Sequence, residues 1–375
     1  MYRQGIKILL QGIKLLLMGG NMKKLIVLAV MAVVLSFSGS VMAKNTLRIL
    51  TWKGYAPEAL VNKFEKQTGI KVELIYSNNE EMIAKLRATR GAGFDLAQPS
   101  QDRISSVQAK YHIYRPLNYS KIKKSEFVPS MLRAVKKNTK VKNRSFAVPF
   151  CYGTSGLIVN KKLAPYAKDY SDLLNPMYKG KISYRLKRPT LIAMAFAKGD
   201  NPFAKYSNPK AYKELMDGVA ADLIKAKPLV KNYWANGDAL LSMMRSGEVI
   251  VAMGWDGGGW KLHKENPDID FVAPASGALG WIDTFAIPAK SQNIKGAYKW
   301  INFMLSPENA AVFTNESGYG TASKGANKYL VKEKKDNFER TFSKADIDNI
   351  KWYPPVPEKL EKIEGKILDL IKATR

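Results

Sequence analysis

The hydrophobic pattern of residues 47–58 predicts a buried strand that ends in a tight turn and leads into a helix. Three of the four residues in 47–50 are apolar, and Gly54 and Pro57 favour a turn followed by the first turn of a helix. Trp52 and Tyr55 lie within this turn. Because ligands bind at the carboxyl ends of strands in α/β proteins, we expect both rings to form one wall of a ligand cleft. The alternative is that they only fill a hydrophobic core.

The alternation of strand and helix patterns continues along the first part of the chain. Apolar spacing predicts helices over 59–68 and 79–89, with Asn79 placed to cap the second, and strands over 71–76 and 94–97. This order is that of a parallel β-α-β sheet.

A glycine-containing segment at 151–154 lies between two predicted strands, 146–150 and 155–160, and we interpret it as a crossover between two halves of the molecule. The glycine-rich segment 254–260 is expected to be a loop. The later part alternates again. Its predicted strands cover 181–184, 248–253, 269–272 and 280–288, and its predicted helices cover 189–198, 209–226, 236–246, 294–305, 307–316 and 357–372.

The first 43 residues are expected to lie outside the fold. A basic pair at 23–24 precedes an almost wholly apolar run over 25–37, and small residues at Val41 and Ala43 have the spacing of a signal cleavage site. The run is short for a membrane span, which takes about 20 residues. We therefore predict an N-terminal extension and secretory signal over 1–43, and a soluble mature protein in the periplasm.

The chain is strongly basic, with 60 lysine and arginine residues against 32 acidic residues and a formal charge of +28. Five of the basic residues and none of the acidic ones lie in residues 1–43, so the remainder carries +23. Because the basic residues are dispersed among acids, we interpret them as solvated surface and expect no nucleic-acid partner. The single cysteine, Cys151, lies among apolar residues, which predicts a buried, inert thiol.

Aromatic and acidic residues recur at the ends of the predicted elements. Aromatic faces attract organic cations by about 0.5–2 kcal/mol each, and a hydrogen bond to a charged group contributes about 1.5–3 kcal/mol. The combination predicts a cage for an amine; the alternative is that each tryptophan fills a core and each aspartate caps a helix. The candidate ligand-binding residues are Trp52, Tyr55, Ser100, Asp102, Trp255, Asp256, Trp281, Asp283 and Tyr319.

A basic cluster of Arg185, Lys187 and Arg188 lies between a predicted strand and a predicted helix. It is a possible anion site at a helix start, or else a solvated loop. Gly257–Gly259 lacks the lysine and the spacing of a phosphate-binding loop. The two histidines are isolated, and no Ser-His-Asp set or nucleophile elbow is evident. We expect no metal, no cofactor and no catalytic residue.

Taken together, these segments resemble the spermidine/putrescine-binding periplasmic proteins of ABC importers. The likeness covers nearly all of the chain after the predicted signal and rests on the order and spacing of short segments. They are LTWKGYAP at 50–57, FEKQTGIKV at 64–72, FDLAQPS at 94–100, VPFCYGT at 148–154, WIDTFAIP at 281–288, AYKWINF at 297–303 and GY at 318–319.

The resemblance implies an α/β periplasmic-binding-protein fold of two lobes, type II-like, with mixed sheets flanked by helices and a ligand cleft between the lobes. We expect one lobe from 44–153 and 282–327, and the other from 154–281 and 328–375. By the same resemblance Asp283 is the main amine-binding carboxylate and Ser100 a polar contact. The implied cage aromatics are Trp52, Tyr55, Trp255, Trp281 and Tyr319.

One segment departs from the family pattern. The resemblance implies acidic residues for the far amine after the strand near Ile182, where this chain has Arg185-Leu186-Lys187-Arg188. Either the ligand is a shorter amine, or it is a zwitterion, such as an amino acid or aminophosphonate, whose anionic group faces this cluster.

We therefore expect a monomeric solute-binding protein that closes its lobes on a small amine, such as putrescine or spermidine, and delivers it to an inner-membrane ABC permease. An alternative from another class is a secreted enzyme that uses Asp256 and Asp283 as paired carboxylates.

Overall fold

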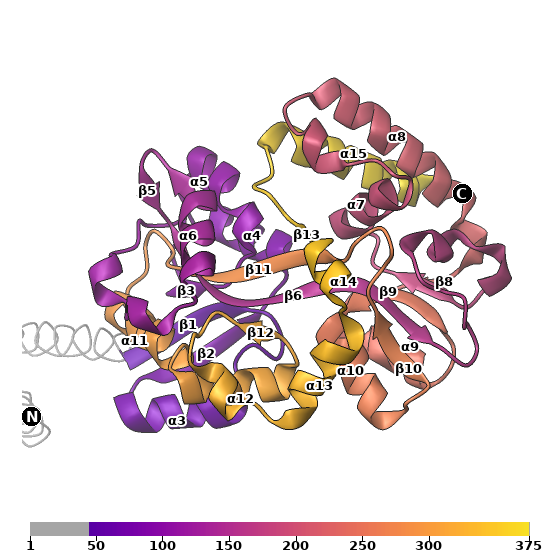
Figure 1. Ribbon diagram of the computed structural model, residues 1–375. Helices are drawn as coiled ribbons and strands as arrows, with labels where there is room; N and C mark the ends of the chain where they lie inside the picture. Colours follow the sequence, from indigo (N-terminus) through magenta and orange to yellow (C-terminus); the bar gives the residue numbers. More distant parts are fainter. Residues whose placement is uncertain (1–44, 375) are drawn as a thin grey trace, which may run out of the picture.

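The computed structural model describes residues 45–374 and shows two α/β halves joined by strands that run through both (Figure 1). The predicted signal peptide lies outside the described residues. The strands are β1 Thr46–Thr51, β2 Lys71–Tyr76, β3 Leu96–Ala97, β4 Lys140–Val141, β5 Arg144–Ser145, β6 Ala147–Asn160, β7 Ile182–Tyr184, β8 Val230–Tyr233, β9 Val251–Trp255, β10 Ile269–Val272, β11 Leu279–Ala286, β12 Gly320–Thr321 and β13 Lys351–Trp352.

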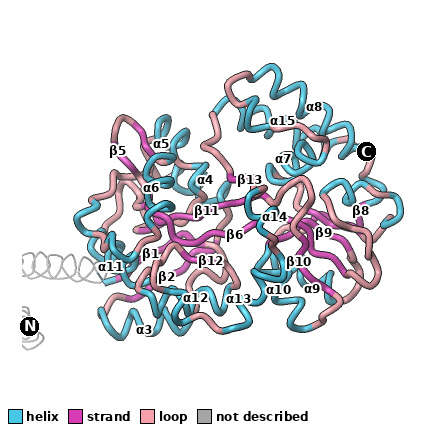
Figure 2. The backbone as a smooth tube through the Cα atoms, in the orientation of Figure 1, coloured by secondary structure: helices cyan, strands magenta, loops and turns pink. Residues whose placement is uncertain are grey.

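Helices surround these strands on the outside of both halves (Figure 2). They are α3 Glu58–Thr68, α4 Asn79–Ala88, α5 Ser105–Tyr111, α6 Pro129–Asn138, α7 Arg188–Ala197, α8 Pro209–Lys225, α9 Gly237–Arg245, α10 Asp256–Glu265, α11 Ile294–Met304, α12 Pro307–Ser317, α13 Lys332–Thr341, α14 Lys344–Asp348 and α15 Glu358–Ala373. The mixed α/β class with two lobes is as predicted.

The two long strands β6 and β11 connect the halves. The strand order is β2-β1-β3-β11-β6-β9-β7-β8, and β10 and β12 also pair with β6. The first part of β6 pairs with β11, and its last part pairs with β9 and β10. The predicted interruption at 151–154 is wrong, since β6 is continuous through it, but the expected crossover is present at this place. The predicted lobe boundaries at 153/154 and 281/282 fall inside these two strands and stay predictions.

The first half begins with the predicted β-α-β unit. β1 pairs in parallel with β2 on one side and β3 on the other. The turn after β1 is as expected: Gly54 has φ +87, which a residue with a Cβ rarely adopts, and Pro57 directly precedes α3. Asn78, not Asn79, caps α4, because its side chain accepts the backbone N–H of Glu81.

The second half holds the parallel strands β8, β7 and β9. Helices α7, α8 and α15 pack together on this half, so that the C-terminal helix lies beside a helix 130 or more positions earlier in the chain (Figure 1). α7 is apolar on almost every side and is buried along nearly all its length, as a helix covered by other elements should be.

Helix α10 was not expected, because three of its first four residues are glycine. Glycine disfavours a helix by about 1 kcal/mol relative to alanine, yet here the missing Cβ permits close packing. A Cβ on Gly257 would lie 2.8 Å from the backbone oxygen of Ser317, and one on Gly259 would lie 2.7 Å from the Cβ of Phe271. The glycines therefore let α10 approach both neighbours, and the helix starts directly at Asp256.

Candidate functional site

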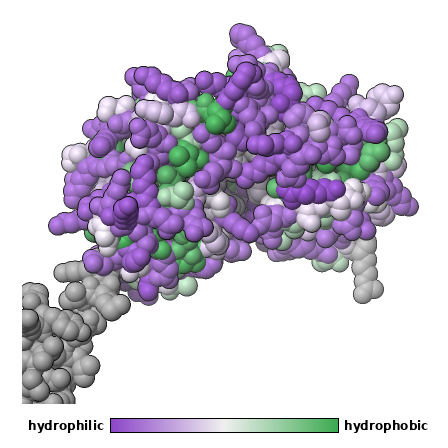
Figure 3. Space-filling view, turned by 90° about the horizontal axis from the view of Figure 1, so that it is seen from below, coloured by the Kyte–Doolittle hydropathy of each residue, from purple (hydrophilic) through white to green (hydrophobic). Residues whose placement is uncertain are grey.

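A cleft of about 810 Å³ lies between the two halves and is lined by residues from both. Its walls come from the turn after β1, the start of α4, the segment after β3, the segment between β7 and α7, the end of β9, the middle of β11, and the turn after α12. In the space-filling view the surface is hollowed where the halves meet, and the surrounding rim is mostly hydrophilic (Figure 3). The segments that follow the carboxyl ends of β1, β3 and β7 thus meet at one cavity, as the predicted fold requires.

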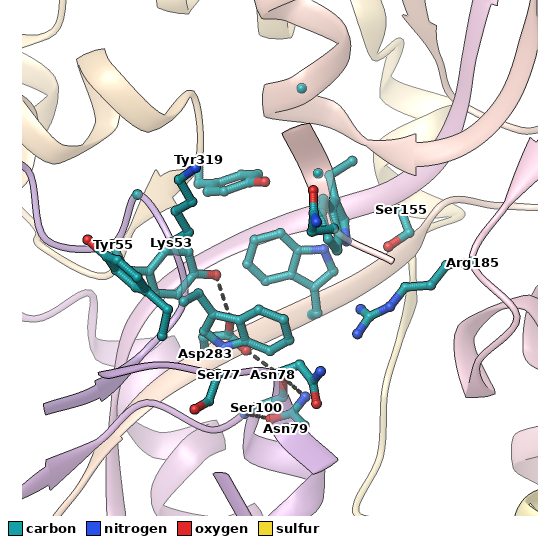
Figure 4. Close-up of a pocket in the computed structure, with 18 of the residues that line it drawn as sticks. Lys53, Tyr55, Ser77, Asn78, Asn79, Ser100, Ser155, Arg185, Asp283 and Tyr319 are labelled. Atoms are coloured by element: carbon teal, nitrogen blue, oxygen red, sulfur yellow. Dashed lines mark hydrogen bonds between the residues drawn. The ribbon is translucent and has the colours of Figure 1, made fainter. Parts of the chain in front are cut away.

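Asp283 is a buried carboxylate that lines this cleft, with only 3% of its surface exposed. It lies on β11 at a register shift against β6. Tyr55 donates its hydroxyl to one carboxylate oxygen and Ser100 donates to the other, both at 2.5 Å (Figure 4). Burial raises the pKa of Asp283 to about 7, and the two hydrogen bonds oppose the rise.

Asn79 fixes the position of Ser100. The Asn79 side-chain amide donates to the Ser100 hydroxyl at 2.9 Å, and the Ser100 backbone N–H donates to the Asn79 carbonyl at 2.9 Å. A chain of hydrogen bonds therefore runs from the start of α4 to Asp283. Asn79, predicted as the helix cap, instead positions a cleft-facing hydroxyl. The two adjacent asparagines at the start of the predicted helix are the only sequence feature that marks this role.

All five predicted cage aromatics line the cleft. The rings of Trp281 and Tyr319 meet edge to face with their centroids 5.0 Å apart, and the Tyr55 and Tyr319 centroids are 6.1 Å apart. The Trp52 indole donates to the backbone oxygen of Gln98 at 3.1 Å, and this bond fixes the ring directly after the carboxyl end of β1. These contacts give the Asp283 side of the cleft an aromatic enclosure.

Trp255 belongs to a separate aromatic contact. Its ring meets that of Trp234 edge to face at 5.0 Å, and the Trp234 indole donates to the backbone oxygen of Met253 at 3.1 Å. Trp255 therefore packs against a ring that is itself held by a hydrogen bond, in the half that holds β7 to β10.

Asp256 is placed differently from the expectation, because it is not among the residues that line the cleft. Its carboxylate accepts the backbone N–H of Thr154 at 2.7 Å, the Thr154 hydroxyl at 3.0 Å and the backbone N–H of Gly257 at 2.7 Å. Burial raises its pKa to about 7 against these three bonds. Asp256 thus ties the start of α10 to the crossover strand β6.

Asp102 lines the cleft, but its carboxylate accepts a hydrogen bond from Arg188 at 3.2 Å. Arg188 also donates to Glu364 of α15 at 3.1 Å and to the hydroxyl of Tyr206. The three charged side chains are almost fully buried. Arg188 is therefore neither a solvated loop residue nor an uncommitted anion ligand, since two carboxylates of the protein already neutralise it.

The other two residues of the basic cluster, Arg185 and Lys187, line the cleft without such partners among residues 45–374. The Arg185 guanidinium carbon lies 5.7 Å from the ring centroid of Trp234. Burial lowers the pKa of Arg185, and the nearby carboxylates Glu80 and Glu81 oppose this. The predicted basic cluster is thus divided into one structural and two cleft-facing residues.

An ion pair that was not predicted from the sequence crosses the cleft. Lys53, in the turn after β1, pairs with Asp238 at the start of α9. Both residues line the cleft and both are exposed. Nothing in the sequence marks this pair, because its members are 185 positions apart.

No metal site and no membrane helix emerge from the described residues. Residues 45–374 contain no group of three or more histidine, cysteine, aspartate or glutamate side chains placed to hold an ion. None of the helices in this part of the chain is both long and apolar enough to cross a bilayer. Cys151 is buried as expected, and burial raises the pKa of its thiol well above the usual value.

Two α/β halves, two crossing strands and a cleft lined from both sides define a solute-binding protein of the two-lobe class. A family model described as bacterial extracellular solute-binding protein matches residues 59–340. The chain belongs to this family.

Relatives with assigned names agree with this classification. The chain is 30% identical to the spermidine/putrescine-binding periplasmic protein of Escherichia coli K12 over 77% of this chain and 81% of that protein. It is 30% identical to spermidine/putrescine-binding periplasmic protein 1 of Haemophilus influenzae over 86% and 88%. A solved structure of a putative spermidine/putrescine ABC transporter from Listeria monocytogenes superposes with a TM-score of 0.77 at 28% identity, covering 88% of this chain and all of that chain.

Proposed function

We propose that this protein is the periplasmic binding component of an ABC importer and that it binds a small solute carrying an ammonium group. The names of the relatives and the predicted signal peptide support export and delivery to an inner-membrane permease. Diamines and polyamines, such as putrescine and spermidine, are the first solutes to test, since the relatives are named for them.

The placement of Asp283 is the observation that carries the proposal. It is a buried carboxylate inside an aromatic enclosure, and its two oxygens are held by Tyr55 and Ser100. An ammonium group beside it would neutralise the carboxylate and remove the cost of burying its charge. The faces of Trp281 and Tyr319 would add cation–π attraction.

Lobe closure is the proposed mechanism. The cleft is lined by Asp283, Tyr55 and Ser100, which are linked to the first half, and by Trp255 and Arg185 of the second half. A solute that contacts both sets binds the closed arrangement better than an open one and shifts the population toward it. The permease would then recognise the closed form. No catalytic step is needed for this function.

The carboxylate-pair alternative receives no support from the geometry. A pair of catalytic carboxylates would have to face one reacting atom. Asp256 instead uses both oxygens on backbone and hydroxyl donors away from the lining of the cleft.

The test is the identity of the solute that the protein carries when it is purified under native conditions. Mass spectrometry after acid release should find a small molecule with a primary or secondary amine in wild-type protein. The Asp283→Ala variant should carry none, whereas the control Glu248→Ala, on the surface away from the cleft, should carry as much as wild type. A bound solute without an amine, or one retained in Asp283→Ala, would overturn the proposal.

A further inference from the structure

The charges of the cleft fall into those that the protein neutralises itself and those that it does not. Two lining pairs are Lys53 with Asp238 and Arg188 with Asp102. A third pair joins Arg103 and Glu80 at 3.2 Å. These pairs hold lining side chains in place but leave no charge for a ligand to match. The recognition of a charged solute therefore depends on the residues outside them.

Arg185 is the main cation that remains. Its Nε is buried and has no hydrogen-bond partner among residues 45–374. The carboxylates of Glu80 and Glu81 act on Arg185 electrostatically, but neither accepts a hydrogen bond from it. Glu80 accepts from Arg103, and Glu81 accepts the side-chain amide of Asn78 at 2.8 Å in the capping box of α4. A partly desolvated guanidinium that no hydrogen-bonded anion compensates is costly, because burial removes water that nothing replaces.

The surroundings of Arg185 are suited to an acid group. Figure 4 shows Arg185 and Ser155 on the side of the cleft opposite Tyr55 and Asp283, with the guanidinium directed toward the interior. Ser155 is buried and lines the cleft, and its hydroxyl makes no hydrogen bond to the protein among the described residues. A guanidinium binds a carboxylate or phosphonate through two parallel hydrogen bonds, and a hydroxyl can donate a third.

A dication is poorly matched to this arrangement. Its first ammonium would meet Asp283, but its second would approach Arg185 and Lys187. Glu80 acts on both of these cations but forms its ion pair with Arg103. Like charges at short range repel each other more strongly in a partly desolvated cleft than in water. The far side of the cleft therefore disfavours a second amine.

We infer that the solute is bipolar: an ammonium group at the Asp283 side and an anionic acid group at the Arg185 side, as in a linear ω-amino acid. This inference rests on the proposed function, because it places the ammonium group at the same carboxylate. It adds the class of the solute and the residue that selects it.

The test compares solutes of equal length that differ at one end. Calorimetry on the purified protein, freed of carried-over solute, would use 3-aminopropanoate to 6-aminohexanoate and the diamines of three to six carbons. We expect at least one ω-amino acid to bind tenfold or more tightly than the diamine of the same length. Arg185→Gln should weaken that amino acid at least tenfold and should not weaken the diamine.

Two further variants separate the effect of the paired guanidinium hydrogen bonds from the effect of positive charge. Arg185→Lys keeps the charge and loses the paired hydrogen bonds, so its affinity for the amino acid should fall between those of wild type and Arg185→Gln. Lys140→Gln removes one charge on an exposed hairpin strand away from the cleft and should bind as wild type. An intact melting transition in each variant confirms that it is folded.

The outcomes distinguish the inference from the proposed function beneath it. Diamines that bind better than every amino acid of their length, or an Arg185→Gln variant with unchanged affinity for the amino acid, would overturn the bipolar solute while leaving the amine site intact. Binding that is unaffected by Asp283→Asn would overturn the proposed function itself. Binding of neither series would overturn the assignment of a linear ω-amino acid.

Discussion

Asp283 and Asp256 offer a sharp test of how burial affects this protein, because burial raises the pKa of both carboxyls but their neighbours differ. Burial raises the pKa of each to about 7. Asp283 lines the cleft, whereas Asp256 is bonded to Thr154 and Gly257 away from it. Replacement of either residue by asparagine should therefore change how the free energy of unfolding depends on pH. Only the replacement of Asp283 should also change the affinity for the solute.

The magnitude for stability follows from the shift. Each carboxyl rises from 3.8 to about 7, which is roughly three pKa units, and one unit corresponds to about 1.4 kcal/mol. Because the folded state holds the proton more tightly than the unfolded state, the stability gained from it is fully present below pH 3.8. It is lost as the pH rises through 7. The free energy of unfolding should thus fall by about 4 kcal/mol per group across this window.

The assay is urea unfolding of wild type, Asp283→Asn and Asp256→Asn between pH 4 and pH 8. The stability of each variant relative to wild type should improve by about 4 kcal/mol from the acidic to the neutral end, because asparagine does not titrate. A relative stability that is constant with pH would show that the carboxyl titrates near its ordinary pKa when folded, and would refute the burial reasoning.

The affinity for the solute should distinguish Asp283 from Asp256. An ammonium ligand requires ionised Asp283, so affinity for the solute should fall about tenfold for each pH unit below 7 and level off above it. Asp256→Asn should keep this pH dependence, whereas Asp283→Asn should lose the affinity at every pH. Calorimetry at pH 5 to 8 measures both. Equal affinity at pH 5 and pH 8 in wild type would contradict the assignment of the ammonium to Asp283.

Three other changes test the surroundings of the site. Tyr55→Phe removes a hydrogen bond that lowers the pKa of Asp283, so the midpoint of the binding profile should move above pH 7, as calorimetry against pH would show. Arg188→Met leaves Asp102 and Glu364 buried without a cation and should cost about 3–5 kcal/mol in urea unfolding; an unchanged midpoint would contradict the buried network. Gly153→Ala places a Cβ 2.5 Å from the Trp281 ring and should weaken solute binding at least tenfold, while Gly218→Ala, where a Cβ meets nothing within 4 Å, should bind as wild type.

The parts of the site that the sequence predicted are those that depend on neighbouring residues. Trp281 and Asp283 were candidates from their place at the end of a predicted strand. They are two positions apart on β11, and residues at i and i+2 of a strand point to the same side, so both line one cavity. Trp52 and Tyr55 follow a strongly apolar strand and lie in a turn marked by Gly54 and Pro57. Local periodicity and turn chemistry made these residues candidates, and the resemblance to the family favoured the cleft over a hydrophobic core.

The parts that the sequence did not predict depend on contacts between distant residues. Arg188 meets Asp102 from 86 positions away and Glu364 from 176 positions away, so the basic cluster could not be divided into structural and cleft-facing residues in advance. Asp256 was expected to face the cleft, and its segment, residues 254–260, was predicted to be a loop. Tertiary packing of Gly257 and Gly259 outweighs their low helix propensity, and the resulting helix turns Asp256 toward Thr154.

The division of charges also bears on how a solute would close the protein. Asp283 is bonded to Tyr55 and Ser100 of the half that holds β1 to β3, whereas Arg185 follows β7 in the other half. Neither of these two charges has an ion-pair partner in its own half among residues 45–374. A solute with an ammonium at one end and an acid group at the other satisfies both only when the halves are together, so its binding energy depends on closure. A monoamine would satisfy Asp283 in an open arrangement as well and would provide a weaker signal to the permease.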